Sequence, residues 1–310
     1  MSVAFAVRQG TPEWLAARRD LVTASDIPIL LGVSPFKCEA DLADEKRGLA
    51  ETESTLRMRV GLALEDLIAA EYEAKTGYKT RRWAGLAIHP SISWAGASPD
   101  RKRKGALVEL KHTTSRSRFA DGLPQDVEAQ VAWQMGVTGY EHTDVAVLTG
   151  DDLLVFPVEY DHALFVDLFE VAKDFRRRLE AGGPFKRDTA RIKRDYPADD
   201  GSVMTADADL DAAVKALIDL RGQRKRLEDS ETTIEDAIKA RMGPVSRLVG
   251  DGFTVTWRKT KDVTTTDWKA LADGLLRQLP EGQREPLIGL HSDVREGFRP
   301  FRVVVASKED

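Results

Sequence analysis

Two short segments, residues 94–97 and 106–111, flank the polar sequence Ser98-Pro99-Asp100 and the basic sequence Arg-Lys-Arg-Lys-Gly. This pattern predicts two strands joined at the basic sequence into a hairpin. Asp100 and Glu109 are then expected to face each other, since residues in register on neighbouring strands lie ~5 Å apart. Two carboxylates at that distance repel each other unless a cation neutralises them. The fold must therefore accommodate a charged site where this hairpin ends.

A third acid, Glu65, lies on a helix expected from about residue 56 to residue 75. Apolar residues recur there at helical spacing, and the helix is expected to stop at Gly77. Carboxylate oxygens bind the hard divalent cations that hold the attacking and leaving oxygens during phosphodiester hydrolysis. We therefore interpret Glu65, Asp100 and Glu109 as the metal site of a nuclease.

Lys111 follows Glu109 by two residues, so the two side chains share one face of the predicted strand. There the Lys111 ammonium can orient or help deprotonate the attacking water and stabilise charge in the transition state. The alternative is a surface hairpin with ordinary ion pairs, because a lone Glu-x-Lys sequence is common. Its combination with Asp100 and Glu65 favours the functional interpretation.

Length and composition bound the architecture and the class of protein. The 310 residues exceed one modal domain, so we expect a catalytic domain over residues 1–200 and an accessory region over residues 201–310. The single cysteine, Cys38, excludes an internal disulfide and a four-cysteine zinc site. No apolar run approaches the ~20 residues that span a bilayer, so we expect a cytoplasmic protein with no membrane partner.

The formal net charge of −5 conceals a local basic stretch. Phosphate binding depends on where the cations lie, because only those near the nucleic-acid backbone release counterions. Glu109 is the only acid between residues 101 and 118, and we take Arg116 in this stretch as a candidate substrate contact. A second basic cluster, within residues 176–194, is interpreted as a solvated helix face. The basic residues of the first stretch are Arg101, Lys102, Arg103, Lys104, Lys111, Arg116 and Arg118.

Apolar spacing predicts further elements around this hairpin. Strands are expected at 86–88, 144–148 and 153–158, and helices at 127–136 and 162–179. The helix over 127–136 carries Gln130 and Gln134 on one face. We take Gln130 as a candidate catalytic residue and DNA contact, and Gln134 as an ordinary polar residue.

The chain changes character after residue 200. A long helix or helical hairpin is expected over residues 206–242 and is interpreted as a surface for self-association or partner docking. A small hairpin ending in 253–257 and a strand at 301–305 follow. In the helical segment Ala213, Leu220, Leu227 and Ile234 recur every seven residues, and Leu210, Leu217 and Ile238 lie near a second seam that Arg224 and Glu231 interrupt.

Six motifs together resemble the bacteriophage lambda exonuclease and YqaJ-like viral recombinase group of the PD-(D/E)XK nucleases. They occur in the order of that family and cover about residues 8 to 180. The resemblance implies an α/β, restriction-endonuclease-like fold with a mixed central sheet flanked by helices. The motifs are Trp14-(three residues)-Arg18, Thr23-Ala24-Ser25-Asp26, Gly61-(three residues)-Glu65, Ser98-Pro99-Asp100, Glu109-Leu110-Lys111 and Ala129-Gln130-Val131.

The resemblance also implies an activity, a cofactor and partners. It implies Mg²⁺-dependent digestion of linear double-stranded DNA from the 5′ end, leaving a 3′ overhang for a single-strand annealing protein. Two Mg²⁺ per site are expected, with Mn²⁺ able to substitute, and the chain is expected to form a homo-oligomer. The implied roles are metal ligands for Asp100, Glu109 and the Leu110 backbone carbonyl, a metal or water contact for Glu65, catalytic lysine for Lys111, and a position near the scissile strand for Gln130.

The N-terminal motif agrees with this on physical grounds. Thr11-Pro12 predicts a short helix that carries Arg18, and the Thr23-to-Asp26 motif resembles a capping box opening a second helix. Ser25 at that helix start, with Thr23 and Arg18, offers donors to a terminal 5′-phosphate. The alternative is that Thr23 and Ser25 only cap the helix while Arg18 pairs with an acid; we favour phosphate binding.

Two other functions stay open. One is a non-catalytic DNA-end-binding or recombination scaffold that retains the fold, and the other is an endonuclease of the same fold. Residues 201–310 match nothing in the lambda enzyme, which puts in doubt whether its ring-shaped trimer is kept.

Overall fold

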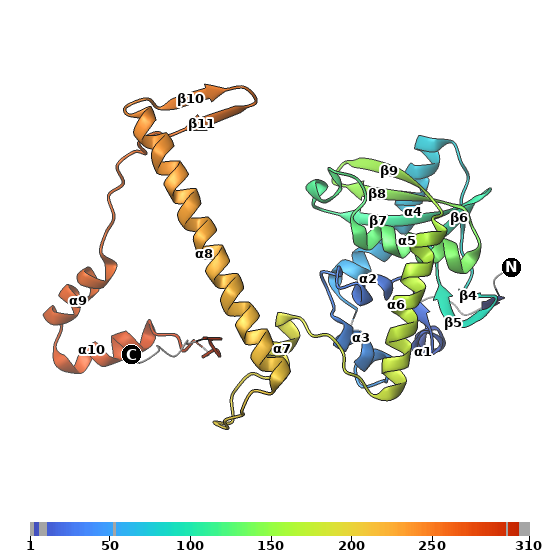
Figure 1. Ribbon diagram of the computed structural model, residues 1–310, viewed down its shortest axis with the longest axis horizontal. Helices are drawn as coiled ribbons and strands as arrows, with labels where there is room; N and C mark the ends of the chain where they lie inside the picture. Colours follow the sequence, from blue (N-terminus) through green and yellow to red (C-terminus); the bar gives the residue numbers. More distant parts are fainter. Residues whose placement is uncertain (1–2, 6–10, 52–53, 296, 304–310) are drawn as a thin grey trace. The chain divides into compact units, whose positions relative to one another are not determined.

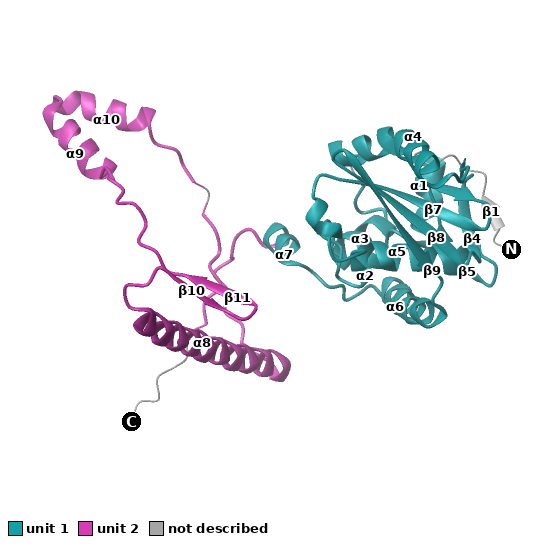
Figure 2. Ribbon diagram, turned by 90° about the horizontal axis from the view of Figure 1, so that it is seen from above, with its two compact units in different colours: residues 1–195 teal, residues 196–310 magenta. Residues whose placement is uncertain are grey.

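The structure is a computed structural model that describes residues 3–5, 11–51, 54–295 and 297–303. The chain divides into two compact units, residues 1–195 and 196–310, which are coloured separately in Figure 2. The sequence predicts the division after residue 200. All the residues predicted to form the site lie in the first unit.

A five-stranded mixed sheet forms the centre of the first unit. In spatial order its strands are β3 (Arg81–Arg82), β6 (Arg101–Arg103), β7 (Ala106–Thr113), β8 (His142–Thr149) and β9 (Asp152–Glu159) (Figure 1). Strands β7 and β8 are parallel, and the other neighbours are antiparallel. A parallel pair needs a crossover connection. Helix α5 (Gln125–Thr138) supplies it.

A second sheet contains four strands. In spatial order they are β1 (Val3–Phe5), β4 (Leu86–His89), β5 (Ile92–Ala97) and β2 (Val22–Thr23), with β2 and β5 parallel. The predicted hairpin is wrong in one respect: residues 94–97 belong to β5 of this sheet, whereas Arg101–Arg103, expected in the turn, form strand β6 of the central sheet. Strand pairing uses backbone groups, and at this position the basic side chains do not prevent it.

Helices cover both faces of the central sheet. Helix α4 (Leu56–Thr76) ends before Gly77, which adopts φ +76° as helix-terminating glycines do. Its Tyr72 is buried in one cluster with Ala146 of β8. The neighbouring Val145 is buried in a different cluster with Val131 of α5. Because side chains alternate along a strand, α4 and α5 lie on opposite faces. The predicted mixed α/β fold class is confirmed.

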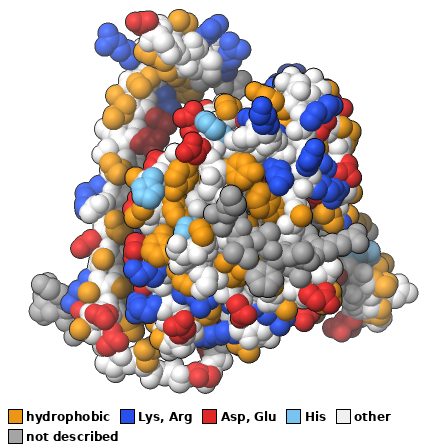
Figure 3. All heavy atoms as spheres, turned by 90° about the vertical axis from the view of Figure 1, so that its right-hand side faces the viewer, with side chains coloured by type: hydrophobic (Ala, Val, Ile, Leu, Met, Phe, Trp, Pro, Cys, Tyr) orange, Lys and Arg blue, Asp and Glu red, His pale blue; other side chains and the backbone are white. Residues whose placement is uncertain are grey.

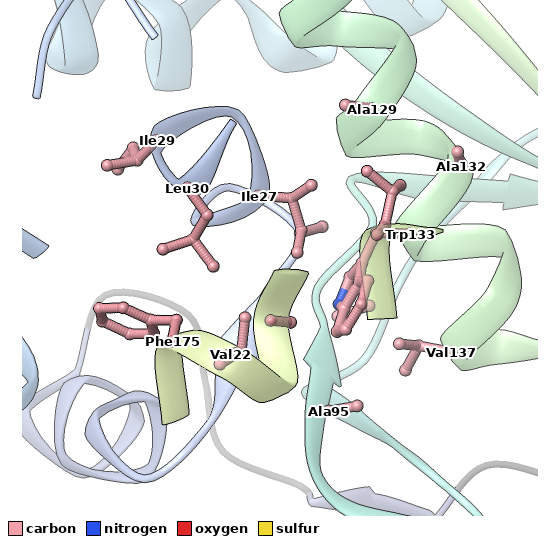
Figure 4. Close-up of a cluster of buried hydrophobic side chains, with 14 of the residues drawn as sticks. Val22, Ile27, Ile29, Leu30, Ala95, Ala129, Ala132, Trp133, Val137 and Phe175 are labelled. Carbon is pink, nitrogen blue, oxygen red and sulfur yellow. The ribbon is translucent and has the colours of Figure 1, made fainter. Parts of the chain in front are cut away.

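A large buried cluster holds α5 against the second sheet (Figure 4). It also joins helices α2 (Ile27–Leu30) and α6 (His162–Ala181). Trp133 of α5 is fully buried here, and its Nε1 donates a hydrogen bond to the Gly96 carbonyl oxygen of β5 at 3.1 Å. This contact fixes the rotation of α5. The remaining elements of the unit are α1 (Pro12–Arg19), α3 (Glu39–Lys46), the 3₁₀ turn η1 (Arg116–Phe119) and α7 (Thr189–Asp195).

The second unit is built on one long helix. Helix α8 (Ala208–Met242) is continuous over 35 residues. Of the two arrangements expected from the sequence, one long helix or a helical hairpin, it is therefore the long helix. Strands β10 (Arg247–Gly250) and β11 (Phe253–Thr256) form an antiparallel hairpin, followed by helices α9 (Trp268–Gln278) and α10 (Glu281–Leu290). The strand predicted at 301–305 is wrong for residues 301–303, which lie in no strand, and residues 304–305 lie outside the described residues.

The charged side chains are unevenly distributed over the surface. On the face shown in Figure 3, Lys and Arg side chains gather at the upper right, whereas both signs of charge mix along the lower edge. The net charge therefore does not describe each part of the surface. Within the described residues, no helix has both the length and the apolar character needed to cross a membrane.

Candidate active site

One cavity of about 250 Å³ gathers most of the residues that the sequence singled out. Its lining comes from α1, β2 and the segment after it, α4, β4, the segment before β6, β7 and α5. The predicted site residues that line it are Arg18, Thr23, Ser25, Glu65, Asp100, Glu109, Leu110, Lys111 and Gln130. Residues from 18 to 130 along the chain thus meet in one space.

Asp100 and Glu109 lie next to each other at the end of the β6–β7 hairpin. Arg101 pairs with Val108, so the register continues to Asp100 opposite Glu109. The Leu110 N–H donates a hydrogen bond to Asp100 Oδ2 at 2.8 Å. The hairpin therefore fixes the Asp100 carboxylate against the backbone of β7.

Glu109 is the centre of a buried hydrogen-bond network and is only 2% exposed. Its Oε1 accepts hydrogen bonds from Lys111 Nζ and Gln130 Nε2, each at 2.7 Å. Its Oε2 accepts one from Gln134 Nε2 at 2.8 Å. Lys111 Nζ also donates to Gln130 Oε1 at 2.9 Å. Two glutamines of α5 and one lysine of β7 thus hold the Glu109 carboxylate.

The electrostatics of the cavity show an excess of buried acid. Burial raises the pKa of Asp100 well above its usual value, and the charge of Glu109 adds to this. Burial also raises the pKa of Glu65, against the opposing charge of Arg82. Burial alone would lower the pKa of Lys111, but the charges of Glu109 and Asp100 outweigh it and raise that pKa. The lining holds three carboxylates against the two cations Lys111 and Arg18, and Arg82 lies 3.9 Å from Glu65 Oε2. The pKa values of Asp100 and Glu65 are raised even so, which indicates that the cavity favours a further positive charge.

The donor chemistry of the cavity fits a hard divalent cation, because its acidic ligands are oxygens. The arrangement is not that of a finished ion site: in the described ranges, no three His, Cys, Asp or Glu groups are gathered to hold a metal. Glu109 Oε1 accepts two hydrogen bonds, so an ion binding at that oxygen would displace Lys111 or Gln130, whereas Oε2 accepts only the bond from Gln134 and keeps a lone pair for an ion. The three carboxylates therefore line one cavity, as expected, but in the described residues they are not gathered around one ion position.

Arg18, Thr23 and Ser25 form a second polar group in the same cavity. Arg18 Nη2 donates to Thr23 Oγ1 at 2.9 Å and to Ser25 Oγ at 2.6 Å. Arg18 lies 3.9 Å from Asp26 Oδ1, whereas Lys46 Nζ lies 2.7 Å from Asp26 Oδ2. Lys46 is thus the main counter-ion of Asp26, which leaves the Arg18 guanidinium with the two hydroxyls.

The helix expected to begin at the Thr23-to-Asp26 motif is wrong. Thr23 lies in β2, and the one-turn helix α2 begins only at Ile27. Asp26 Oδ2 accepts hydrogen bonds from the backbone N–H and the hydroxyl of Thr23, at 2.8 and 2.9 Å. These bonds close a turn before the helix, so Ser25 is presented by a turn and not by a helix terminus.

The structure leaves one predicted residue outside the cavity, and the residues that it adds to the lining include Gln134 and Trp14. Arg116 does not line it; its Nη2 pairs with Asp152 Oδ2 at 2.9 Å on the surface. Gln134, expected to be an ordinary polar residue, lines the cavity and is 1% exposed. Trp14 also lines it, with the Arg18 guanidinium 4.4 Å from its ring centroid. The i, i+4 spacing of Gln130 and Gln134 was a signal, but it could not distinguish a buried face from a solvated one.

Comparisons with known proteins give relatives for the first unit. Residues 13–141 match the YqaJ-like viral recombinase domain family. The uncharacterized protein YqaJ of Bacillus subtilis (strain 168) is 31% identical over 182 residues, which cover 55% of this chain and 57% of that protein. The chain thus spans little more than half the length of this curated relative.

Solved structures resemble the same part of the chain. The alkaline exonuclease LHK-Exo from Laribacter hongkongensis is 27% identical, covering 56% of this chain and 94% of its own, with a TM-score of 0.49. A phage-related exonuclease from Haemophilus somnus 129PT is 10% identical, covering 53% and 96%, with a TM-score of 0.40. Residues 13–141 of this chain are therefore similar to the YqaJ-like viral recombinase domain family.

Proposed function

We propose that this chain is a Mg²⁺-dependent exonuclease that digests linear double-stranded DNA from the 5′ end and leaves a 3′ overhang. The observation that carries the proposal is the meeting of two groups in one cavity. The acidic group with Lys111 suits phosphodiester hydrolysis, and the group of Arg18, Thr23 and Ser25 suits an anion. An enzyme that cuts beside a strand end needs both groups within one binding site.

Asp100, Glu109, Glu65 and the Leu110 carbonyl are the groups that would hold Mg²⁺, two ions per site, or Mn²⁺ in its place. When bound, the ions supply Lewis-acid stabilisation of the charge that develops on the phosphate oxygens. The chain's own contribution is to fix the carboxylates. The Leu110 N–H holds Asp100, and Gln134 holds the Oε2 of Glu109.

Lys111 is placed to act on the attacking water or on the phosphate. Its ammonium is anchored by Glu109 and Gln130, which limits its rotamers before substrate arrives. Its pKa is raised, so it enters the reaction as a positive donor that can orient water and stabilise the transition state. Gln130 bridges Lys111 and Glu109 and is proposed to lie near the scissile strand.

Arg18 with Thr23 and Ser25 is proposed to receive the 5′-phosphate. A guanidinium and two hydroxyls provide several donors to the phosphate oxygens. Asp26 does not compete strongly for Arg18, because Lys46 is its closer partner. To bind a phosphate, the Arg18 guanidinium would only need to share its N–H donors between the phosphate oxygens and the two hydroxyls.

The family match, to viral recombinases, supports a place in DNA recombination. We propose that the 3′ overhang is passed to a single-strand annealing protein in the cytoplasm of a bacterium or an infected host. A non-catalytic DNA-end-binding scaffold is the second candidate. One observation favours this candidate. Hydrogen bonds already join Arg18 to Thr23 and Ser25, whereas the described residues contain no group of three or more His, Cys, Asp or Glu side chains placed to hold a metal.

The test compares linear duplex bearing a 5′-phosphate, the same duplex bearing a 5′-hydroxyl, and closed circles, in Mg²⁺ or in chelator. The proposal predicts loss of linear duplex in Mg²⁺ only, fastest with the phosphate, and no loss with Glu109→Ala. Binding of ends without digestion would identify the scaffold. Cutting of closed circles would identify an endonuclease of the same fold.

A further inference from the structure

Helix α8 exposes a long apolar stripe. The stripe consists of two seams, and its residues recur at the spacing of a helix that packs against another helix. Leu220, Leu227 and Ile234 are 61%, 72% and 62% exposed. Of the residues in α8, only Met242 at its C-terminal end is buried. The first seam is Ala213, Leu220, Leu227 and Ile234, and the second is Leu210, Leu217, Arg224, Glu231 and Ile238.

A helix of this kind gains most of its stability from packing. In proteins most of the stability of a helix comes from tertiary packing of its apolar face and not from helix propensity. The stripe spans most of a helix that is roughly 50 Å long at 1.5 Å per residue. An occupant must therefore be elongated and apolar along its length, and a second copy of α8 has both properties.

The two charges within the stripe decide how a second copy would lie. In a parallel, in-register pair each residue of the second seam faces its own counterpart, so Arg224 would meet Arg224 and Glu231 would meet Glu231. In an antiparallel pair the two-fold axis can pass midway between these residues. Arg224 of each copy then lies near Glu231 of the partner copy, and the two interruptions of the seam neutralise each other.

A second pair of charges on the edge of the stripe supports the same orientation. Arg221 and Glu235 lie on one side of the stripe, fourteen positions apart along α8. The same axis brings Arg221 close to Glu235 of the other copy. Charges that flank a helix–helix seam set the orientation of the partner, and both pairs favour the antiparallel one. Glu228, midway between Arg221 and Glu235 on the same edge, then lies beside its own counterpart at the axis, where Arg224 is its nearest opposite charge.

Existing contacts do not oppose this exchange. Arg224 Nε pairs with Glu228 within the helix at 3.3 Å, and Lys239 pairs with Glu235 at 2.7 Å. The Arg221 guanidinium lies 5.9 Å from the Phe301 ring centroid. The two ion pairs are surface pairs between adjacent turns, and such pairs contribute little to stability, as does a cation–π contact at an exposed site. We propose that α8 is a dimerisation helix, which pairs antiparallel with α8 of a second copy of this chain.

The proposal is tested on the full chain by the mass in solution, using size-exclusion chromatography with light scattering across a dilution series. The wild-type chain should have twice the 34.4 kDa mass of one chain. Arg224→Glu places two acids side by side in an antiparallel pair, so the dimer dissociation constant should rise at least about tenfold. Glu231→Arg should do the same, and the double variant should restore the wild-type value.

Lys225→Glu is the matched control, since it reverses a charge next to Arg224 but outside the stripe. It should leave the dissociation constant unchanged, and circular dichroism should show equal helix content in all variants. A wild-type monomer at every concentration, or an assembly that responds to neither single reversal, would overturn the proposal. So would single reversals that the double variant fails to rescue.

A cysteine variant tests the orientation separately. In a Cys38→Ser background, Ala213→Cys places one thiol near the N-terminal end of each helix. Antiparallel copies hold these thiols roughly 40 Å apart at 1.5 Å per residue, so oxidation should give no disulfide-linked dimer. Efficient cross-linking would show the parallel arrangement and contradict the proposal.

Discussion

Gln134 Nε2 lies 2.8 Å from Glu109 Oε2 and donates a hydrogen bond to it from a position that is 1% exposed. Gln130, one helical turn earlier, donates to the other oxygen of the same carboxylate. Both amides project from α5, whose rotation Trp133 fixes through Gly96. The orientation of Glu109 is thus set from the helix as well as from its own strand.

The first prediction concerns Gln134. Gln134→Leu removes the donor to Glu109 Oε2 and leaves a buried carboxylate oxygen unpaired, which costs about 1–3 kcal/mol. We expect the Mg²⁺ concentration for half-maximal digestion to rise at least about tenfold, with a lower melting temperature. Gln125→Leu, an exposed glutamine at the start of the same helix, is the control and should change neither. Unchanged Mg²⁺ dependence in Gln134→Leu would show that this contact is dispensable.

The second prediction concerns Arg18. Arg18→Ala removes the guanidinium that joins Thr23 and Ser25 in the cavity. The variant should lose the preference for a 5′-phosphate over a 5′-hydroxyl, with at least about tenfold weaker binding of the phosphorylated end. Fluorescence anisotropy with the two duplexes measures this. Arg19→Ala, the exposed neighbour, should keep the preference; a preference that survives in Arg18→Ala would place the phosphate elsewhere.

Much of the site could be predicted because it depends on local sequence. The helix that carries Glu65 follows from apolar spacing and Gly77, and the separation of Asp100 and Glu109 follows from a hairpin. Strand β6 could not be predicted, because three consecutive basic residues show no alternation of apolar and polar side chains. Its strand conformation depends on backbone pairing with β3 and β7 on either side.

Two further features depended on contacts distant in sequence. The burial of Gln134 results from how α5 packs on the central sheet, which helical periodicity does not report. The start of α2 depends on Asp26, whose carboxylate binds Thr23 and is neutralised by Lys46 of α3. A capping-box pattern at this position therefore marks a turn, because its acid is used for a tertiary contact.

The third prediction concerns stability at alkaline pH. Burial and the hydrogen bond to Asp144 raise the pKa of Tyr72 to about 12. The unfolded chain loses this proton near pH 10, so the contribution of Tyr72 is complete below pH 10 and is lost as the pH rises toward 12. Tyr72→Phe should cost about 1–3 kcal/mol at pH 8. Chemical unfolding from pH 8 to 12 should show a smaller loss in the variant; equal losses would contradict this role.

The fourth prediction concerns the packing of α5. A Cβ at Gly136 would lie 2.1 Å from Phe165 Cδ2 of α6, closer than any tolerated contact. Gly136→Ala should therefore destabilise the first unit by about 1–3 kcal/mol, measured by chemical unfolding. Gly61→Ala in α4 meets nothing within 4 Å and should be neutral or stabilising. Equal stability of the two variants would mean that α5 and α6 are packed less tightly.

Binding of Mn²⁺ to the DNA-free protein, followed by electron paramagnetic resonance of the free ion, tests the central claim most directly. The cavity with Asp100 and Glu109 should take up the ion, so the wild-type protein should lower the free-ion signal. Asp100→Asn combined with Glu109→Gln should leave that signal at its protein-free level, while Glu71→Gln, an exposed acid on α4, should bind as the wild type does. Equal uptake by the double variant and the wild type would contradict the account.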